Sequence, residues 1–93
     1  DMVSVHSLRR GAAEAIEIIA RGDESTSRVV GRRIESLDLP PGTTIGAILR
    51  EEELLIAHHD TVIESDDHVV LFLTDKNRID EIEQLFSVGF GFF

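Results

Sequence analysis

The sequence has 93 residues, which is enough for one small domain with a limited hydrophobic core. It contains no cysteine, which excludes disulfide bonds, thiolate catalysis and metal sites built on cysteine. The net charge is −9, from 18 acidic and 9 basic side chains without a basic stripe, which argues against binding to nucleic acid or to an anionic membrane surface. The longest apolar run, residues 69–73, is far shorter than the about 20 residues that cross a bilayer, and no signal peptide is evident. We therefore expect a cytoplasmic protein without membrane insertion.

The first predicted element is a helix within residues 6–22. Ser7 is a suitable N-cap, and Gly22 suits the position after the last helical turn. Between them, apolar residues recur at the spacing of one buried helix face: Leu8, Ala12, Ala15, Ile16 and Ile19.

The same segment predicts a contact with a partner. On a helix, Ile18 lies about 100° from Ile19 and about 200° from Ile16, so the three isoleucines cannot share one narrow stripe. A second apolar face implies a second surface that buries it, and the neighbouring alanines allow close approach. We therefore expect a homodimer, and its interface candidates are Ala12, Ile16, Ile18 and Ile19.

A short second helix is predicted over residues 27–37, where Val30, Ile34 and Leu37 form its buried face. The "LPPG" sequence at residues 39–42 ends it, because proline lacks an N–H and disfavours helix in the residue before it.

The pattern then changes to that of a sheet. Strands are expected at residues 43–50, 54–59 and 68–74, with a short extended piece around Val62 and Ile63. The near-continuous apolar run of the third strand indicates a central strand that is buried on both faces. Short connections between the strands favour antiparallel pairing.

Thr74 is expected to cap a last helix, in which Ile79, Ile82 and Phe86 form the buried face. An aromatic tail, residues 88–93, follows it; its phenylalanines Phe90, Phe92 and Phe93 suit a contact with a larger assembly. The predicted fold class is α+β: a small, mostly antiparallel sheet covered by helices and preceded by a crossover helix.

Three histidines suggest a metal or proton-handling site, and a solvated turn is the alternative. His58 and His59 point to opposite faces of a strand and so do not easily share one metal ion. A set of His58, Asp60 and His68 is conceivable if a hairpin joins them, but its spacing matches no short metal motif. We favour the turn, in which His59→Ala or Asp67→Asn changes stability by less than about 1 kcal/mol, whereas Val70→Ala or Leu71→Ala costs more.

Neither catalysis nor a cofactor is predicted. The paired carboxylates, residues 51–53 and 64–67, fall in predicted turns, where water keeps all of them ionised and none is tuned for acid–base work. The glycines form neither G-x-G-x-x-G nor G-x-x-x-x-G-K-[ST], so no phosphate-binding loop is present. The arginines at positions 28, 32 and 33 suit a solvated face better than an anion site.

From residue 23 to residue 87 the chain resembles the C-terminal domain of RCK proteins, the regulators of potassium conductance, also called the TrkA-C domain. A segment of the form G-[RK]-x-[IL]-x-x-[LI]-x-L spans residues 31–39 and precedes the proline–glycine turn. Asp60, Ile63 and Asp67 then match D-x-x-[IL]-x-x-x-D before an apolar strand and a closing helix. Where the family usually carries glycine before the last aspartate, this chain has Asp66.

The resemblance implies a division of the chain and a role. Residues 1–22 would be the end of a preceding Rossmann domain and its crossover helix, residues 23–87 the C-terminal domain and residues 88–93 the tail. Such proteins are non-catalytic cytoplasmic regulators that dimerise, form a larger ring and gate a membrane potassium transporter. NAD would bind only in the Rossmann domain, so no cofactor is expected among these residues. A metal-dependent enzyme or metal sensor that uses His58, His59 and His68 is the alternative, and a stand-alone dimerisation domain is a third possibility.

Overall fold

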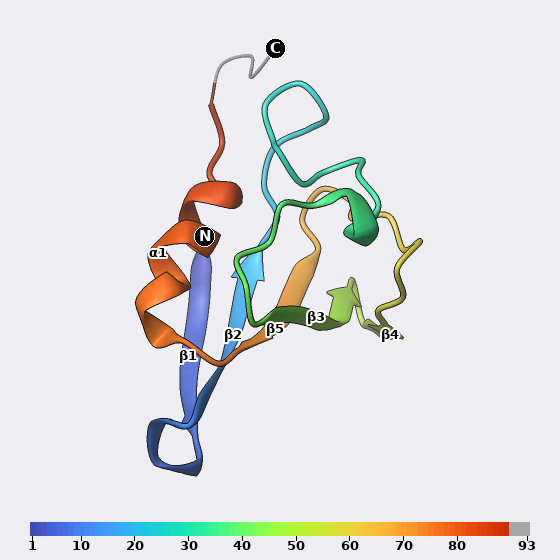
Figure 1. Cartoon of the computed structure of the whole chain (residues 1–93). Coiled ribbons are helices and arrows are strands. Elements are labelled where there is room, and N and C mark those ends of the chain that lie inside the picture. The colour runs from blue at the N-terminus through green and yellow to red at the C-terminus, as the bar shows by residue number, and fades with distance from the viewer. Residues whose placement is uncertain (90–93) are drawn as a thin grey trace.

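The computed structural model describes residues 1–89, which form one antiparallel sheet of five strands in the order β1-β2-β5-β3-β4. A single α-helix, α1, follows the last strand (Figure 1). This confirms the predicted α+β class. The strands are β1 (Met2–Leu8), β2 (Ala13–Ile19), β3 (Thr43–Arg50), β4 (Glu53–Ile56) and β5 (His68–Leu73); the helix α1 is Ile79–Leu85, and three short 3-10 turns are η1 (Arg9–Gly11), η2 (Ile34–Ser36) and η3 (Lys76–Arg78).

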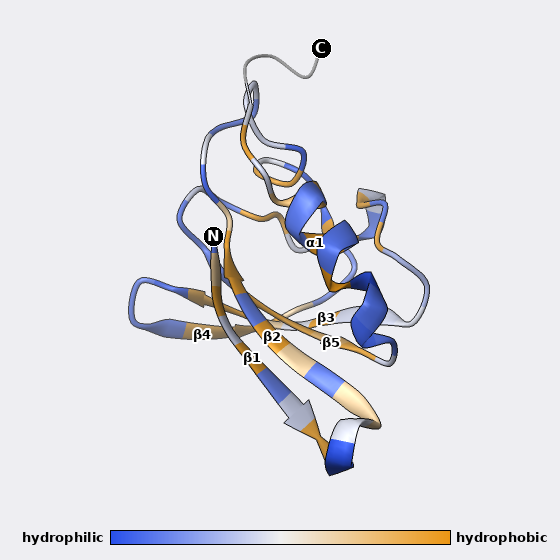
Figure 2. Ribbon diagram, turned by 90° about the vertical axis from the view of Figure 1, so that its left-hand side faces the viewer, coloured by the Kyte–Doolittle hydropathy of each residue, from blue (hydrophilic) through white to orange (hydrophobic). Residues whose placement is uncertain are grey.

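The hydrophobic core lies between one face of the sheet and α1. Strand residues of alternating position point into it, as the two-residue period of a strand requires. In β5 these are Val69, Leu71 and Leu73, each at most 2% exposed, and α1 with its C-terminal neighbour adds Ile82 and Phe86. Figure 2 shows α1 on the core side of the sheet. Among residues 1–89, no helix is long and apolar enough to span a membrane.

The predicted first helix is wrong, and with it the crossover helix: this segment is the β1–β2 hairpin. In β2 the sequence AEAIEII also has a period of two, and its even positions, Glu14, Ile16 and Ile18, are buried while the odd positions 13, 15 and 17 are partly exposed. Isoleucine is β-branched and favours a strand when both periods fit. Gly11, with a φ of 92°, completes the turn that a helix would not contain.

The predicted second helix is also absent, and only η2 is helical in that segment. Gly31 interrupts it, because its φ of 82° lies outside the helical region. Its N–H instead donates to the carbonyl of Ile63 at 2.7 Å, and Arg33 forms an isolated antiparallel bridge with Val62. The extended piece predicted at Val62 and Ile63 is therefore confirmed, and the connection is fixed by backbone hydrogen bonds rather than by a helix.

The later elements agree better with the prediction. β5 lies between β2 and β3 and is the central strand, as expected. Its expected burial on both faces is wrong, because Phe72 on the far side is 43% exposed. The capping residue is Asp75 rather than Thr74: it caps η3, which leads directly into α1, and its carboxylate accepts from the N–H of Asn77 at 3.0 Å. Phe90, Phe92 and Phe93 lie outside the described residues.

Candidate functional site

A buried ion pair joins β3 to the start of β5. Asp67 is 1% exposed, and both of its oxygens accept from Arg50: Nε to Oδ1 at 2.9 Å and Nη2 to Oδ2 at 2.8 Å. The Asp67 Oδ2 also accepts from the N–H of Glu64 at 2.8 Å. Hydrogen bonding to Asp67 raises the pKa of Arg50 above its ordinary value, so the guanidinium stays charged.

The position of Asp67 corrects the prediction that it is a solvated turn residue. Arg50 also contacts Glu64, with Nη1 to Oε2 at 3.0 Å, and donates to the carbonyl of Val62 at 3.0 Å. The acidic segment before β5 is thereby fastened to the end of β3. Asp67, the last aspartate of the D-x-x-[IL]-x-x-x-D element, therefore has a structural role: its contacts hold the segment before β5 in place.

The three histidines do not come together. His59 Nδ1 lies 2.9 Å from the Glu35 carboxylate, and His68 Nδ1 lies 2.6 Å from that of Glu17. His58 follows β4 and is exposed without joining either pair. Within residues 1–89, no group of three histidine, aspartate or glutamate side chains is placed to hold a metal ion.

The hydrogen bond from His59 lowers the pKa of Glu35. Both side chains are largely exposed, at 77% for His59 and 45% for Glu35, so the pair is a surface contact.

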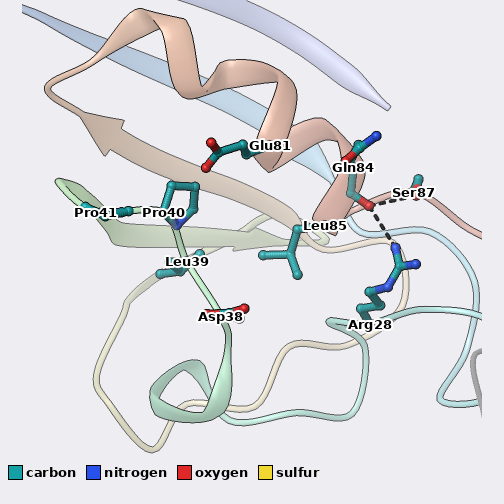
Figure 3. Close-up of a pocket in the computed structure, with 9 residues that line it drawn as sticks. All are labelled: Arg28, Asp38, Leu39, Pro40, Pro41, Glu81, Gln84, Leu85 and Ser87. Carbon is teal, nitrogen blue, oxygen red and sulfur yellow. Dashed lines mark hydrogen bonds between the residues drawn. The ribbon is translucent and has the colours of Figure 1, made fainter.

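A shallow pocket of about 590 Å³ lies between α1 and the segment that leads into β3 (Figure 3). At one side, Arg28 Nη1 donates to the carbonyl of Gln84 at 3.1 Å, and the Ser87 hydroxyl donates to the same oxygen at 2.7 Å. The charged residues that line the pocket are therefore one arginine, Arg28, and two carboxylates, Asp38 and Glu81. The pocket is lined by Arg28, Asp38, Leu39, Pro40, Pro41, Glu81, Gln84, Leu85 and Ser87.

The face of the sheet opposite α1 has no covering element among residues 1–89 (Figure 2). We call it the open face. Its central residue is Val70, which pairs with Glu17 in β2 and with Ala47 in β3. Its most exposed apolar side chains are Leu54 at 59%, Ile56 at 64% and Phe72 at 43%. The Phe72 ring lies against Gly46, where an added Cβ would come within 2.6 Å of it.

The dimer-interface candidates lie in different surroundings. Ile16 and Ile18 are each 1% exposed and belong to the core of the chain itself, so a partner does not reach them. Ile19 is 9% exposed at the end of β2. Ala12 is exposed in the β1–β2 turn, where its N–H donates to the carbonyl of Leu8 at 3.0 Å. The argument from two helix faces fails because the segment is a strand, and dimerisation itself stays a prediction.

The model of the TrkA-C domain family matches residues 23–87. The chain belongs to this family. The resemblance drawn from the sequence is confirmed over the same residues on which it was based. The TrkA-C sheet also includes β2, which lies outside the matched residues but pairs along its length with β5.

Curated relatives point to one member of the family. The chain is 64% identical over 93 residues to the Trk system potassium uptake protein TrkA of Halomonas elongata, and 67% identical over 87 residues to that of Vibrio alginolyticus. These alignments cover 100% and 94% of the chain but only 20% and 19% of the relatives. Within the family, the segments SLRRGAAEAIE and GDESTSRVVG are typical of TrkA, and these relatives confirm that likeness. The chain spans about a fifth of the length of these relatives.

A solved structure shows the same fold. The RCK_C domain dimer of S. agalactiae BusR in complex with c-di-AMP is 29% identical, with a TM-score of 0.65, and the match covers 82% of this chain and 93% of that chain. The TrkA-C assignment thus has support from both sequence and structure.

Two features of the structure, the buried Asp67 and the open face, were not predicted from the sequence. The burial of Asp67 depends on Arg50, which is 17 residues away, and no local pattern shows such a pairing. The open face was hidden by the continuous apolar run of β5. The one available signal was Gly46 in the middle of a strand, since such a glycine often marks a place where another group approaches closely.

Proposed function

We propose that this chain is a regulatory module of a potassium uptake system and has no catalytic activity. It acts on the cytoplasmic side of the cell membrane, dimerises, and takes part in gating a membrane potassium transporter subunit. The observation that carries the proposal is the 64% identity, over the whole chain, with a protein named for potassium uptake.

The geometry supports a non-catalytic role. General acid–base catalysis requires a carboxylate or histidine whose pKa is tuned beside a substrate site. Asp67, the most deeply buried carboxylate of residues 1–89, is neutralised by Arg50, and neither it nor the buried Glu14 lines the pocket of Figure 3. Glu35 and His59 lie on the surface, where water surrounds them.

We propose dimerisation and cofactor use from the similarity of this chain to other members of its family. The BusR structure is described as an RCK_C domain dimer, and this chain shares its fold. We expect a homodimer here and a larger ring in the full-length protein. We expect NAD to bind in a Rossmann domain and not among these residues, which contain no phosphate-binding loop.

The cyclic dinucleotide of the BusR complex is not part of this proposal. A cyclic dinucleotide carries two phosphates, which require cationic or N–H donors. The pocket in Figure 3 offers one arginine, already donating to Gln84, beside the carboxylates of Asp38 and Glu81. That charge balance opposes a dianionic ligand.

A chimaera tests the function. The C-terminal fifth of Halomonas elongata TrkA is replaced by this chain, and potassium uptake is measured in cells that lack their own TrkA. Uptake near that of the unmodified protein is expected, and loss of uptake is expected when the fifth is deleted. If the chimaera accumulates to normal levels and uptake is no better than in the deletion, the proposal is wrong.

A metal titration tests the alternative of a metal-dependent enzyme or metal sensor. Zinc, manganese and calcium are titrated calorimetrically into the chain and into its His68→Ala variant. The separation of His58, His59 and His68 predicts no stoichiometric binding at micromolar metal in either protein. Stoichiometric zinc binding that His68→Ala abolishes would instead establish the metal-site alternative.

A further inference from the structure

Two arginines stand at the tip of the β1–β2 hairpin without partners. Arg9 and Arg10 are exposed, and within residues 1–89 neither guanidinium forms an ion pair or a hydrogen bond. Both have left-handed backbone angles, with φ of 49° and 57°, a region that residues other than glycine, asparagine and aspartate rarely adopt. The hairpin projects beyond the rest of the sheet at the bottom of Figure 1. A chain with a net charge of −9 thus presents two cations at its most prominent corner.

The β3–β4 turn has the opposite charge. Glu51 and Glu52 are exposed there, and neither carboxylate forms an ion pair or a hydrogen bond within the described part of the chain. Arg50 beside them is already occupied by Asp67 and Glu64.

The register places these two turns at diagonally opposite corners of the sheet. The β1–β2 turn lies at the end where Leu73 pairs with Glu14 and with Thr43. The β3–β4 turn lies at the other end, where His68 pairs with Leu49. β1 and β4 are the two edges of the sheet, so the turns differ in both end and edge.

Between these corners lies the open face, with its exposed Leu54, Ile56 and Phe72. The charged groups near its centre, Glu17 and His68, contact each other at 2.6 Å and do not need a partner's charge. The face therefore combines an apolar middle with one cationic and one anionic corner. A surface of this kind is complementary to itself.

We propose that the open face binds the open face of a second copy of this chain, with Arg9 and Arg10 of each copy against Glu51 and Glu52 of the other. The two copies are related by a two-fold axis that lies between them, parallel to both sheets. This axis runs along the diagonal that joins the two uncharged corners, so it places the cationic corner of each copy on the anionic corner of the other. The strands of the two copies then cross at about 90°, which is one of the two usual arrangements of packed sheets. The inference rests on the homodimer of the proposed function and names the surface that forms it.

Charge reversal at both turns tests the interface. The first variant, R9E/R10E, has glutamates at both corners, and the second, E51R/E52R, has arginines at both. Each variant alone repels its own copies, whereas a mixture of the two restores both contacts in a heterodimer. R33E/K76E is the control, because it makes the same change of net charge as R9E/R10E outside the two turns. Circular dichroism and thermal melting confirm that every variant is folded.

A second pair of variants tests the apolar middle. Ile56→Glu places a charge on the open face, and Val62→Glu places one at a site that is 41% exposed outside it. Sedimentation velocity at micromolar concentration and low salt is expected to show a dimer for the wild type, R33E/K76E and Val62→Glu. It is expected to show monomers for Ile56→Glu and for each reversed variant alone, and a dimer for the mixture. Added salt is expected to weaken the wild-type dimer, because its corner charges are exposed to screening.

Three results would overturn the interface: a monomeric wild type, a dimer that Ile56→Glu and both reversals leave intact, or a mixture that stays monomeric. None of these involves a transport measurement. If the chimaera restores uptake while the chain is monomeric, the interface and the homodimer are refuted and the role in potassium uptake stands. If the chain forms the expected dimer but the chimaera does not restore uptake, the role in potassium uptake is refuted and the interface stands.

Discussion

Replacing Asp67 by asparagine tests the buried ion pair with minimal change of shape. The variant keeps an acceptor oxygen but places an amide NH₂ where Oδ1 or Oδ2 now receives a donor. One charged hydrogen bond from Arg50 is lost, and a guanidinium nitrogen faces another donor at a distance now 2.8 or 2.9 Å. The neighbouring Asp66→Asn is the matched control, since Asp66 is 71% exposed and its ion pair with Arg21 lies on the surface. Asparagine also tolerates the φ of 70° at that position.

The expected magnitudes follow from burial. Removing one partner of a buried ion pair typically costs about 3–5 kcal/mol. Arg50 is 27% exposed and keeps its contact with Glu64, which places Asp67→Asn at the lower end, about 3 kcal/mol. An exposed ion pair contributes about 0–1 kcal/mol, so Asp66→Asn is expected to cost less than about 1 kcal/mol.

Urea unfolding followed by circular dichroism measures both variants. The free energy of unfolding is expected to fall for Asp67→Asn with an unchanged dependence on urea, which shows that stability rather than compactness of the unfolded state has changed. For a domain of this size, about 3 kcal/mol corresponds to a fall in Tm of at least about 12 °C. Equal losses in the two variants, or a loss below about 1 kcal/mol for Asp67→Asn, would refute the assignment of Asp67 as the buried anchor.

Two further predictions concern the core and the surface histidine. Leu71→Ala is expected to cost about 2–5 kcal/mol because Leu71 is 0% exposed, whereas Val70→Ala on the open face is expected to cost clearly less; equal costs by urea unfolding would contradict the assignment of the two faces. His59→Ala is expected to return the pKa of Glu35, measured by NMR titration, towards its ordinary 4.5. Since folding lowers this pKa, its contribution to stability is present above pH 4.5 and is lost as the pH falls through the folded value. An unchanged Glu35 midpoint would show that the contact with His59 is not formed in solution.

The parts of the fold that the sequence predicts correctly are those with one dominant pattern. β3 and β5 have β-branched apolar runs next to turn residues. The helix α1 has an unambiguous helical spacing and follows η3, which Asp75 caps. The segment of β2 fits both periods, because Ile16 and Ile19 recur at helical distances from Leu8 and Ala12 while Ile16 and Ile18 alternate as in a strand. Only the pairing with β5, about 50 residues later in the chain, decides between the two.

The candidate site follows the same division. The exposure of His59 and the absence of a phosphate-binding loop can be predicted from neighbouring residues. The burial of Asp67 and the self-complementary corners of the open face depend on the order of the strands, which local patterns do not determine.

The position of β5 also determines how the chain can fold. The central strand of the sheet is the last strand to be synthesised. Before it is made, no strand joins the β1–β2 hairpin to the β3–β4 hairpin. Until residues 68–73 leave the ribosome, β2 and β3 each expose an unpaired edge, and such edges are prone to pair with other chains. Most of the contacts that close the sheet join distant parts of the sequence, which slows folding. We expect this domain to fold only after its synthesis is nearly complete, in one cooperative step in which β5 pairs with both β2 and β3.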